Sequence, residues 1–218
     1  MKDPRTARLI MELRQAGITD TRLLRAMELV PRHLFIGDNL FQQAWEDRAL
    51  PIGCGQTISQ PLVVAAMTQS LELSDMHKVL EVGTGSGYQA AILSRLCRRV
   101  YSLERHRDLY LAAEEHLLSL GIKNATLRMG DGWKGWPEQV PFDRIIVTAA
   151  AYEVPQVLFE QLAPGGHLVV PVGPEFEVQE LRRYTKDPVS GAMKMVDLFP
   201  VRFVPMLHGL GNPGRVPS

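Results

Sequence analysis

The sequence predicts an α/β protein in which a mostly parallel central sheet lies between helices. Apolar runs of strand length, such as residues 79–82 and 100–103, alternate with stretches of helical spacing, such as 88–97. This alternation is typical of a parallel sheet. The first of these strands also breaks into a G-x-G-x-G motif that begins at Gly83. Strand, glycine turn and helix together form nucleotide-type pockets at the carboxyl end of a strand.

Helices are expected at the N-terminus, ahead of the sheet. Asp3 can cap the first helix with Pro4 at its first position, and Gly17 ends its apolar stripe. A second helix begins near Asp20 and ends before Pro31. We interpret these helices as a cover that packs against the main sheet.

The segment 44–61 is unusual because it combines turn residues and polar groups with large apolar residues such as Trp45. A loop of this composition is a candidate for a functional role. Pro61 then begins an amphipathic helix, for which the hydroxyls of Thr57 and Ser59 are candidate caps. The spacing alone leaves both capping and a functional role open for these hydroxyls.

The remaining segments complete the sheet. A helix is predicted over 154–163, with Pro164-Gly165-Gly166 as its end. The last two strands alternate loosely around a turn at 186–191, as an antiparallel pair does. Further strands are expected at 125–129, 144–148 and 167–172, and the antiparallel pair at 177–185 and 193–204.

Composition limits the classes of function. The 218 residues suffice for one large domain, and 24 basic against 24 acidic residues give no general attraction to nucleic acid or membrane. Cys54 and Cys97 have the spacing of neither a metal site nor a disulfide framework, and the histidines are scattered without the spacing of metal ligands. The sequence shows no apolar leader and no apolar run of membrane length. We therefore expect a cytoplasmic protein without a metal site and without a membrane or nucleic-acid partner.

Two acids indicate the cofactor. Glu104 ends the second strand 21 residues after Gly83 (104 − 83), where a carboxylate can accept hydrogen bonds from both hydroxyls of a ribose. The glycine spacing differs from the dinucleotide fingerprint, and Glu81 stands just before the turn. An acid at this place opposes a phosphate but suits the ammonium of an amino-acid-bearing nucleoside. These features favour S-adenosylmethionine.

The stretch LEVGTGSGY (80–88) resembles the first motif of the class I methyltransferases. The stretches QTISQP (56–61) and WEDR (45–48) resemble signatures of the protein-L-isoaspartate O-methyltransferase family. The resemblance covers nearly the whole chain to about Met206, and its further motifs follow in the same order at 102–105, 130–132, 142–151, 164–166 and 201–205.

This resemblance implies a Rossmann-like class I methyltransferase fold in a single domain, 1–218. Within it we expect a helical cover and active-site loop (1–60), a cofactor-binding α/β core (61–206) and a tail (207–218) that does not resemble the usual end of the family. The chain also departs from the family pattern at Ala49, Cys54 and Tyr152.

The resemblance also implies a reaction. The methyl group of S-adenosylmethionine passes to the α-carboxylate of L-isoaspartyl residues in damaged proteins and peptides, and S-adenosylhomocysteine is released. We expect a monomer in which Ser59 is the catalytic residue, orienting the substrate carboxylate through one hydrogen bond. The expected cofactor-binding residues are Thr57, Ile58, Glu81, Gly83, Thr84, Gly85, Ser86, Glu104, Asp131 and Gly132.

Asp131 has two interpretations. Its carboxylate stands at the edge of the expected pocket and can accept from an adenine amino group, whereas an Asp-Gly turn explains the same residues structurally. Residues 148–151 (TAAA) lack the Asn/Asp-Pro-Pro-aromatic motif of amino-group methyltransferases, which argues against DNA-adenine, RNA-amine and glutamine methylation. No Pro-Cys nucleophile is present either, which excludes cytosine C5 chemistry.

Three other functions stay open at this point. A methyltransferase for another carboxylate or hydroxyl would keep the cofactor pocket and change the role of the Ser59 loop. A nicotinamide oxidoreductase is disfavoured by the glycine spacing and Glu81. A non-catalytic protein with the same fold would bind the cofactor without turnover.

Overall fold

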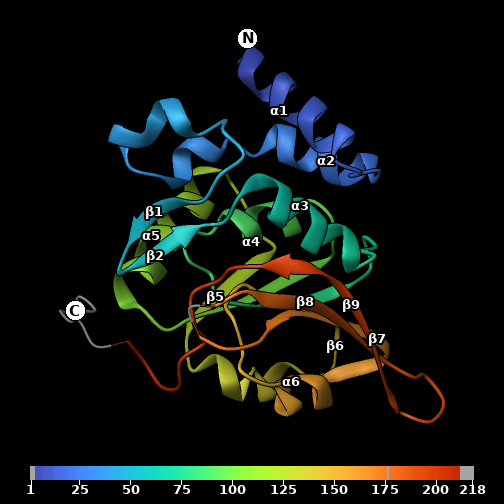
Figure 1. Ribbon diagram of the computed structural model, residues 1–218. Helices are drawn as coiled ribbons and strands as arrows, with labels where there is room; N and C mark the ends of the chain where they lie inside the picture. The colour runs from blue at the N-terminus through green and yellow to red at the C-terminus, as the bar shows by residue number, and fades with distance from the viewer. Residues whose placement is uncertain (1–2, 176, 212–218) are drawn as a thin grey trace.

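Within the described residues, 3–175 and 177–211, the computed structural model has a seven-stranded sheet with helices on both faces (Figure 1). The spatial order is β5–β4–β3–β6–β7–β8–β9, and the pairs from β5 to β7 are parallel while β8 and β9 are antiparallel to their neighbours. The predicted fold class is therefore confirmed. The strands are β3 (Lys78–Val82), β4 (Arg99–Glu104), β5 (Ala125–Met129), β6 (Phe142–Val147), β7 (Leu162–Val172), β8 (Gln179–Lys186) and β9 (Met193–Val201).

The order of the strands places a crevice at the carboxyl end of β3. From β3 the chain moves outward through β4 to β5, and then returns to the other side of β3 with β6. A reversal of this kind leaves a cleft beyond the strand ends, where α/β proteins bind their ligands. The glycine turn follows β3 at this point and leads into α4 (Tyr88–Leu93).

The alternation of side chains along the strands divides the core into two apolar clusters. Val79 faces the cluster that includes the N-terminal helices, whereas Leu80 and Val82 face the cluster that includes Leu158 of α6 (Gln156–Glu160). Successive strand residues point to opposite faces, so a parallel strand buried on both sides is apolar throughout. Figure 1 shows α6 on one face of the sheet and α3 (Pro61–Ser70) and α4 on the other.

The N-terminal cover is present as expected. It comprises α1 (Pro4–Gln15) and α2 (Thr21–Leu29), which lie above α3 in Figure 1. Asp3 caps α1 by accepting from the Arg5 N–H, and Asp20 caps α2 by accepting from two backbone N–H groups. Side-chain oxygens of this kind satisfy the donors that a helix N-terminus leaves free. Among the described residues, no helix is long and apolar enough to cross a bilayer.

Part of the candidate active-site loop is a β-hairpin. Strand β1 (Leu50–Gly53) pairs with β2 (Gln56–Ile58), and the turn between them has positive φ at Cys54 and Gly55. Two consecutive left-handed residues suit a two-residue hairpin turn. The hairpin runs alongside α5 (Arg107–Ser119) in Figure 1. The sequence indicated the loop but not its pairing.

The predicted end of α6 is wrong. The helix was expected over 154–163, but it ends at Glu160, and β7 already begins at Leu162. Phe142 pairs with Leu162, and regular pairing resumes with Arg144 and His167, so the Pro-Gly-Gly segment forms an irregular excursion inside the strand. Pairing with β6 therefore decides this boundary, because the contact of Leu162 with Phe142 draws the chain into the sheet directly after the helix.

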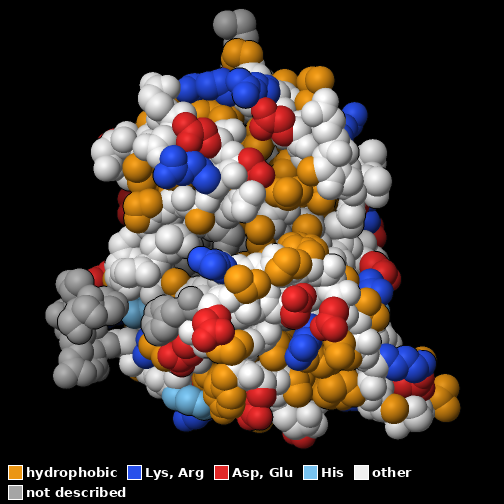
Figure 2. Space-filling model, viewed as in Figure 1, with side chains coloured by type: hydrophobic (Ala, Val, Ile, Leu, Met, Phe, Trp, Pro, Cys, Tyr) orange, Lys and Arg blue, Asp and Glu red, His pale blue; other side chains and the backbone are white. Residues whose placement is uncertain are grey.

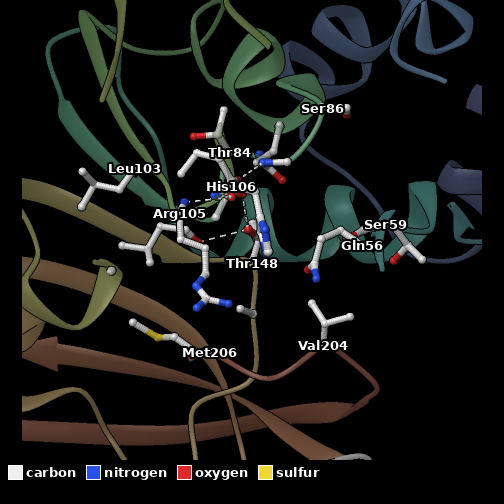
Figure 3. A pocket seen from close by; sticks show the side chains of 18 of the residues that line it. Gln56, Ser59, Thr84, Ser86, Leu103, Arg105, His106, Thr148, Val204 and Met206 are labelled. Carbon is white, nitrogen blue, oxygen red and sulfur yellow. Dashed lines mark hydrogen bonds between the residues drawn. The ribbon is translucent and has the colours of Figure 1, made fainter. Parts of the chain in front are cut away.

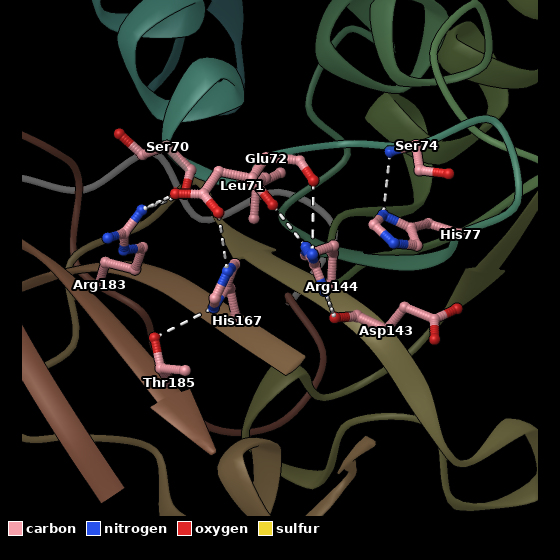
Figure 4. A network of polar contacts seen from close by, with 10 residues as sticks. All are labelled: Ser70, Leu71, Glu72, Ser74, His77, Asp143, Arg144, His167, Arg183 and Thr185. Atoms are coloured by element: carbon pink, nitrogen blue, oxygen red, sulfur yellow. Dashed lines mark hydrogen bonds and ion pairs between the residues drawn. The ribbon is translucent and has the colours of Figure 1, made fainter. Parts of the chain in front are cut away.

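A polar network ties the end of α3 to the sheet at the strand ends that lie opposite the crevice (Figure 4). Glu72, in a left-handed conformation, accepts from Arg183 Nη1 at 2.6 Å and lies 3.4 Å from His167 Nε2. Arg144 donates to the carbonyls of Leu71 and Glu72. These contacts join the end of α3 to β6, β7 and β8. They lie away from the carboxyl ends of the parallel strands, where the crevice is.

Candidate active site

The glycine turn after β3 depends on glycine at its first position. Gly83 has φ +99°, and a Cβ on this residue would collide with the Thr148 hydroxyl oxygen. Thr148 follows β6 and donates its hydroxyl to the Gly83 carbonyl at 2.6 Å. The turn therefore packs directly against the neighbouring strand, and its backbone faces the cleft.

Glu104 fixes the other side of the turn. Its carboxylate is nearly buried and accepts the N–H of Gly85 at 2.7 Å, of Arg105 at 2.8 Å and of His106 at 2.9 Å. The residue ends β4, where the sequence predicted it. Oε1 accepts both Arg105 and His106, whereas Oε2 accepts Gly85 alone and keeps one lone pair, so Glu104 can still accept from a ligand through Oε2. It holds the glycine turn and also lines the pocket.

A pocket opens at this place (Figure 3) and encloses about 910 Å³ free of protein atoms, its mouth included. Figure 2 shows that the molecular surface is hollowed between the N-terminal cover and the sheet. Of the residues predicted for the site, the following line the pocket: Thr57, Ile58, Ser59, Gly83, Thr84, Gly85, Ser86, Glu104 and Gly132.

Two predicted residues lie behind the lining. Glu81 is fully buried and accepts from the Ser102 hydroxyl at 2.5 Å, and Ser102 in turn lies 2.5 Å from the Thr84 hydroxyl. Burial raises the pKa of Glu81 to about 8, so this carboxyl group is protonated at neutral pH. Asp131 accepts backbone N–H groups of Trp133 and Gly209, one on each oxygen.

The suggestion that Ser59 or Thr57 caps α3 is wrong. The residue before the helix is Gln60, which makes no capping contact with its side chain. Asp47, a residue of the WEDR motif, caps the helix instead. Its carboxylate accepts the N–H of Leu62 at 2.7 Å and a hydrogen bond from the side-chain amide of Gln60 at 2.8 Å. No hydrogen bond of the Ser59 hydroxyl is found within residues 3–175 and 177–211, so it remains free to meet a substrate.

A buried arginine holds the active-site loop together. Arg32 donates to the carbonyls of Ala44 at 3.0 Å, Arg48 at 2.8 Å and Ser59 at 3.1 Å. Its side chain is almost inaccessible, and burial lowers the pKa of the guanidinium from its usual value, where it nevertheless remains charged. Arg32 thereby places the backbone of Ser59 at the pocket.

A second hollow adjoins the pocket and shares four lining residues with it. Thr57, Ser59, Thr148 and Val204 line both. The rest of its lining is mainly apolar and comes from the loop before β1, the start of α3, the residue before β8, and the end of β9 with the residues after it, namely Ala49, Gln60, Val63, Val178, Pro200, Val201, Arg202 and Phe203. Ser59 therefore stands at the boundary between two cavities.

Several lining residues were not predicted from the sequence. Figure 3 shows Gln56, Arg105, His106, Thr148 and Met206 around the same cavity as Ser59 and Thr84. Arg105 and His106 directly follow Glu104, so their positions could have been inferred from the strand end. Thr148 ends the strand predicted at 144–148, so its position could have been inferred in the same way, whereas Met206 carries no such signal, because only the fold brings it to the glycine turn.

The fold and this site define a class I methyltransferase. The chain belongs to the protein-L-isoaspartate(D-aspartate) O-methyltransferase family, whose model matches residues 4–211. It is 57% identical over 207 residues to a protein-L-isoaspartate O-methyltransferase of Rhodospirillum rubrum, covering 94% of each chain. A relative of the same description from Paramagnetospirillum magneticum is 53% identical over 209 residues, with 95% of this chain and 97% of the relative covered.

Solved structures agree. A protein-L-isoaspartate O-methyltransferase superposes with a TM-score of 0.85 at 30% identity, over 95% of this chain and 67% of the other. A Plasmodium falciparum structure, described as a beta-aspartate methyltransferase in complex with S-adenosyl-L-homocysteine, gives 0.79 at 27% identity, over 91% and 96%. The family resemblance inferred from the sequence is thus confirmed.

Proposed function

We propose that this protein methylates the α-carboxylate of L-isoaspartyl residues in damaged proteins and peptides, with S-adenosylmethionine as methyl donor. The products are a methyl ester and S-adenosylhomocysteine. The ester then cyclises to a succinimide, whose hydrolysis restores some normal aspartate. The observation that carries the proposal is the position of Ser59, which lines both the pocket at the glycine turn and the adjoining apolar hollow in a chain that matches the family over nearly its full length.

The pocket suits a nucleoside that carries an amino acid. Glu104 presents a carboxylate for ribose hydroxyls, and the glycine turn presents backbone at Gly83 and Gly85. Leu103 and Met206 offer apolar surface for a base. The cofactor supplies the methyl group from its sulfonium, whose sulfur is a good leaving group. We assign cofactor contacts to Thr57, Ile58, Gly83, Thr84, Gly85, Ser86, Glu104 and Gly132, with Glu81 and Asp131 as supports behind them.

The chemistry requires positioning more than proton transfer. A substrate carboxylate with a reference pKa near 4 is already ionised at pH 7, so the site needs no general base. Alignment of the carboxylate oxygen with the methyl carbon and exclusion of water can supply on the order of 7–11 kcal/mol. The free hydroxyl of Ser59 can orient this oxygen through one hydrogen bond, whereas a strong cation would hold the nucleophile too tightly.

The substrate hollow favours broad recognition. Its walls offer mainly apolar surface and backbone groups, many of them from residues 200–204 at the end of β9 and just after it. An extended peptide bound through its main chain would be accepted with many different flanking residues. We therefore expect similar methylation rates across isoaspartyl peptides of unrelated sequence. Methylation of one peptide alone among many would contradict this part of the proposal.

We also propose a monomer in a reducing, cytoplasmic compartment. Both cysteines are free thiols, Cys54 exposed and Cys97 buried, and free thiols persist where the environment is reducing. Light scattering on the purified protein tests the monomer, and fractionation of the source cells tests the compartment. A stable dimer in solution, or recovery outside the cytoplasmic fraction, would refute the respective statement.

The decisive experiment compares two peptides that differ only in the linkage at one residue. One contains L-isoaspartate and the other normal L-aspartate at the same place. Incubation with methyl-labelled S-adenosylmethionine should give base-labile label in the isoaspartyl peptide alone. Equal labelling of both peptides, or label that resists base, would indicate a different acceptor group.

A further inference from the structure

Gln179 is a buried amide at the start of β8, behind the wall of the second hollow. Its side chain is 1% exposed, and it lines neither the hollow nor the cofactor pocket. Its neighbours do line the hollow: Val178 directly precedes it, and Val201 is its pairing partner on β9. The amide therefore lies where the two chain segments that form one wall of the hollow come together.

Each end of the amide holds a backbone group in one of these segments. Its Nε2 donates to the Pro174 carbonyl at 3.1 Å, and its Oε1 accepts the Phe203 N–H at 2.9 Å. Pro174 belongs to the connection between β7 and β8, which ends at Val178, and Phe203 lines the hollow. A buried amide without partners would carry a desolvation penalty, so the two contacts fix this arrangement.

The Gln179 amide fastens the side of the wall that belongs to the second hollow. In the part of the chain that the structure describes, no other side chain hydrogen-bonds the backbone of 201–205. The cofactor side is fastened differently, because the Ala150 N–H donates to the Val204 carbonyl at 2.8 Å and the Ala150 carbonyl accepts the Met206 N–H at 2.7 Å. Met206 lines the cofactor pocket and not the second hollow. Loss of the Gln179 amide should therefore loosen the second hollow and leave the cofactor pocket in place.

We propose that Gln179 is a positioning residue for the peptide substrate: its amide joins the Pro174 carbonyl to the Phe203 N–H and so holds one wall of the second hollow in shape before a peptide binds. The proposal rests on the proposed function, because it takes an isoaspartyl peptide as the occupant of this hollow. A preformed wall spares the peptide the cost of ordering it. Since Gln179 lines neither cavity, its effect should fall on peptide binding and not on the methyl transfer.

Gln179→Met tests this role, because methionine keeps the length and the volume of the side chain and removes both contacts. In steady-state methylation of an isoaspartyl peptide, KM for the peptide should rise about fivefold, the contribution of one hydrogen bond of average strength. The kcat at saturating peptide should stay within about twofold, since a raised KM with unchanged kcat is what the loss of binding alone produces. Calorimetric titration should show an unchanged dissociation constant for S-adenosylhomocysteine.

Gln161→Met is the matched control, because Gln161 is another buried amide that joins two backbone groups. Its Oε1 accepts the Trp136 N–H and its Nε2 donates to the Lys134 carbonyl, both at 2.9 Å. None of these three residues lines either cavity. Both methionine variants should melt at a lower temperature than the unaltered chain, but only Gln179→Met should show the raised KM.

A change at Phe203 reaches the same contact from the other side. Replacement of Phe203 by the corresponding α-hydroxy acid turns its backbone amide into an ester, which removes the N–H and keeps the ring. This ester variant should also raise KM, and its combination with Gln179→Met should raise KM no further than Gln179→Met alone, because both changes break one contact. If Gln179→Met does not fold, the ester variant decides.

The proposal is overturned by an unchanged KM in Gln179→Met or in the ester variant, or by an equal rise in Gln161→Met. It is also overturned if Gln179→Met loses affinity for S-adenosylhomocysteine by the same factor as for the peptide. Each of these results would mean that Gln179 supports the fold at large and not the peptide wall. Failure of the unaltered chain to methylate the isoaspartyl peptide would instead contradict the proposed function.

Discussion

Glu81 is a carboxyl group in a place where water cannot reach it. It lies on β3 directly before the glycine turn, fully buried, with Ser102 as its hydrogen-bond partner and its second oxygen without a partner in the described part of the chain. Desolvation disfavours the charged form, and the pKa rises to about 8. In the ligand-free protein this acid therefore supports Ser102 and Thr84 as a neutral group.

Replacement of Glu81 by glutamine should change how stability depends on pH. The unfolded chain loses the Glu81 proton near its ordinary pKa of 4.5, whereas the folded chain keeps it to about pH 8. Between these values the folded state binds the extra proton, so the free energy of unfolding falls as pH rises, by up to about 1.4 kcal/mol per pH unit from this group. Glu81→Gln should remove this slope, and its stability relative to the unaltered chain should increase from pH 5 to pH 8.

Denaturant unfolding at pH 5, 6, 7 and 8 measures the effect. Glu115→Gln, on the exposed side of α5, is the control and should leave the pH dependence as it is. Parallel curves for Glu81→Gln and the unaltered chain would mean that Glu81 is ionised in the folded protein.

Ser59 and Asp47 allow the roles of orientation and capping to be separated. Ser59→Ala should lower the methylation rate at saturating cofactor several-fold, because one hydrogen bond made in the transition state is worth about 1 kcal/mol, and more in a dry site. Its melting temperature should stay near that of the unaltered chain, since Asp47 and not Ser59 caps α3. Asp47→Ala should instead cost about 0.5–2 kcal/mol of stability.

Rate and melting temperature are measured on the same preparation of each variant. Unaltered turnover in Ser59→Ala would leave this hydroxyl without a part in the reaction. A lowered melting temperature in Ser59→Ala, with none in Asp47→Ala, would reverse the assignment of the cap.

At the scale of elements, the β1–β2 hairpin and the loop before it depend on one side chain. Arg32 donates to four carbonyls spread from Ala44 to Ser59. Arg32→Met keeps the length of the side chain but leaves these acceptors without their donor. The loss should be at least about 3 kcal/mol in stability, because buried carbonyls without partners carry a desolvation penalty.

The same change should weaken peptide binding, since the hairpin and Ser59 move together. Steady-state kinetics on an isoaspartyl peptide should show a raised KM, and thermal unfolding should show a lowered Tm. Arg95→Met, at an exposed arginine, is the control. Normal KM and Tm in Arg32→Met would mean that the loop is held by its other contacts alone.

For the whole molecule, the site joins segments that are distant in sequence, so a bound product should stabilise the entire fold. A ligand at 100 times its dissociation constant contributes about 2.7 kcal/mol, which corresponds to a rise in Tm of roughly 5–10 °C for a chain of this size. S-adenosylhomocysteine should produce this rise in the unaltered chain.

At the same ligand concentration, Glu104→Ala should reduce the rise to about half or less and also lower the Tm without ligand. The second effect follows from the structure, because the carboxylate accepts three backbone N–H groups around the glycine turn. Calorimetric titration should show affinity reduced by roughly 1.5–3 kcal/mol. Glu115→Ala serves as the control on α5. Unchanged affinity in Glu104→Ala would remove this residue from the site.

The sequence by itself determined the parallel sheet, the glycine turn and the acid at the end of the second strand. These features are local: strand periodicity, glycine spacing and strand ends are set by neighbours along the chain. The sequence also carried the family resemblance through short motifs. The fold class and the family were both confirmed. The β1–β2 pairing and the early end of α6 were missed, because they depend on partners far away in the sequence.

The tertiary structure alone decided which polar groups are free. Asp47 caps a helix that begins fourteen residues later (61 − 47), Arg32 holds the loop, and Asp131 accepts the N–H of the distant Gly209. Burial of Glu81 was equally invisible in the sequence, since it depends on how closely β3, β4 and the helices pack. Sequence spacing shows where a side chain stands along the chain, but hydrogen bonding and desolvation are set by contacts made only in the folded protein.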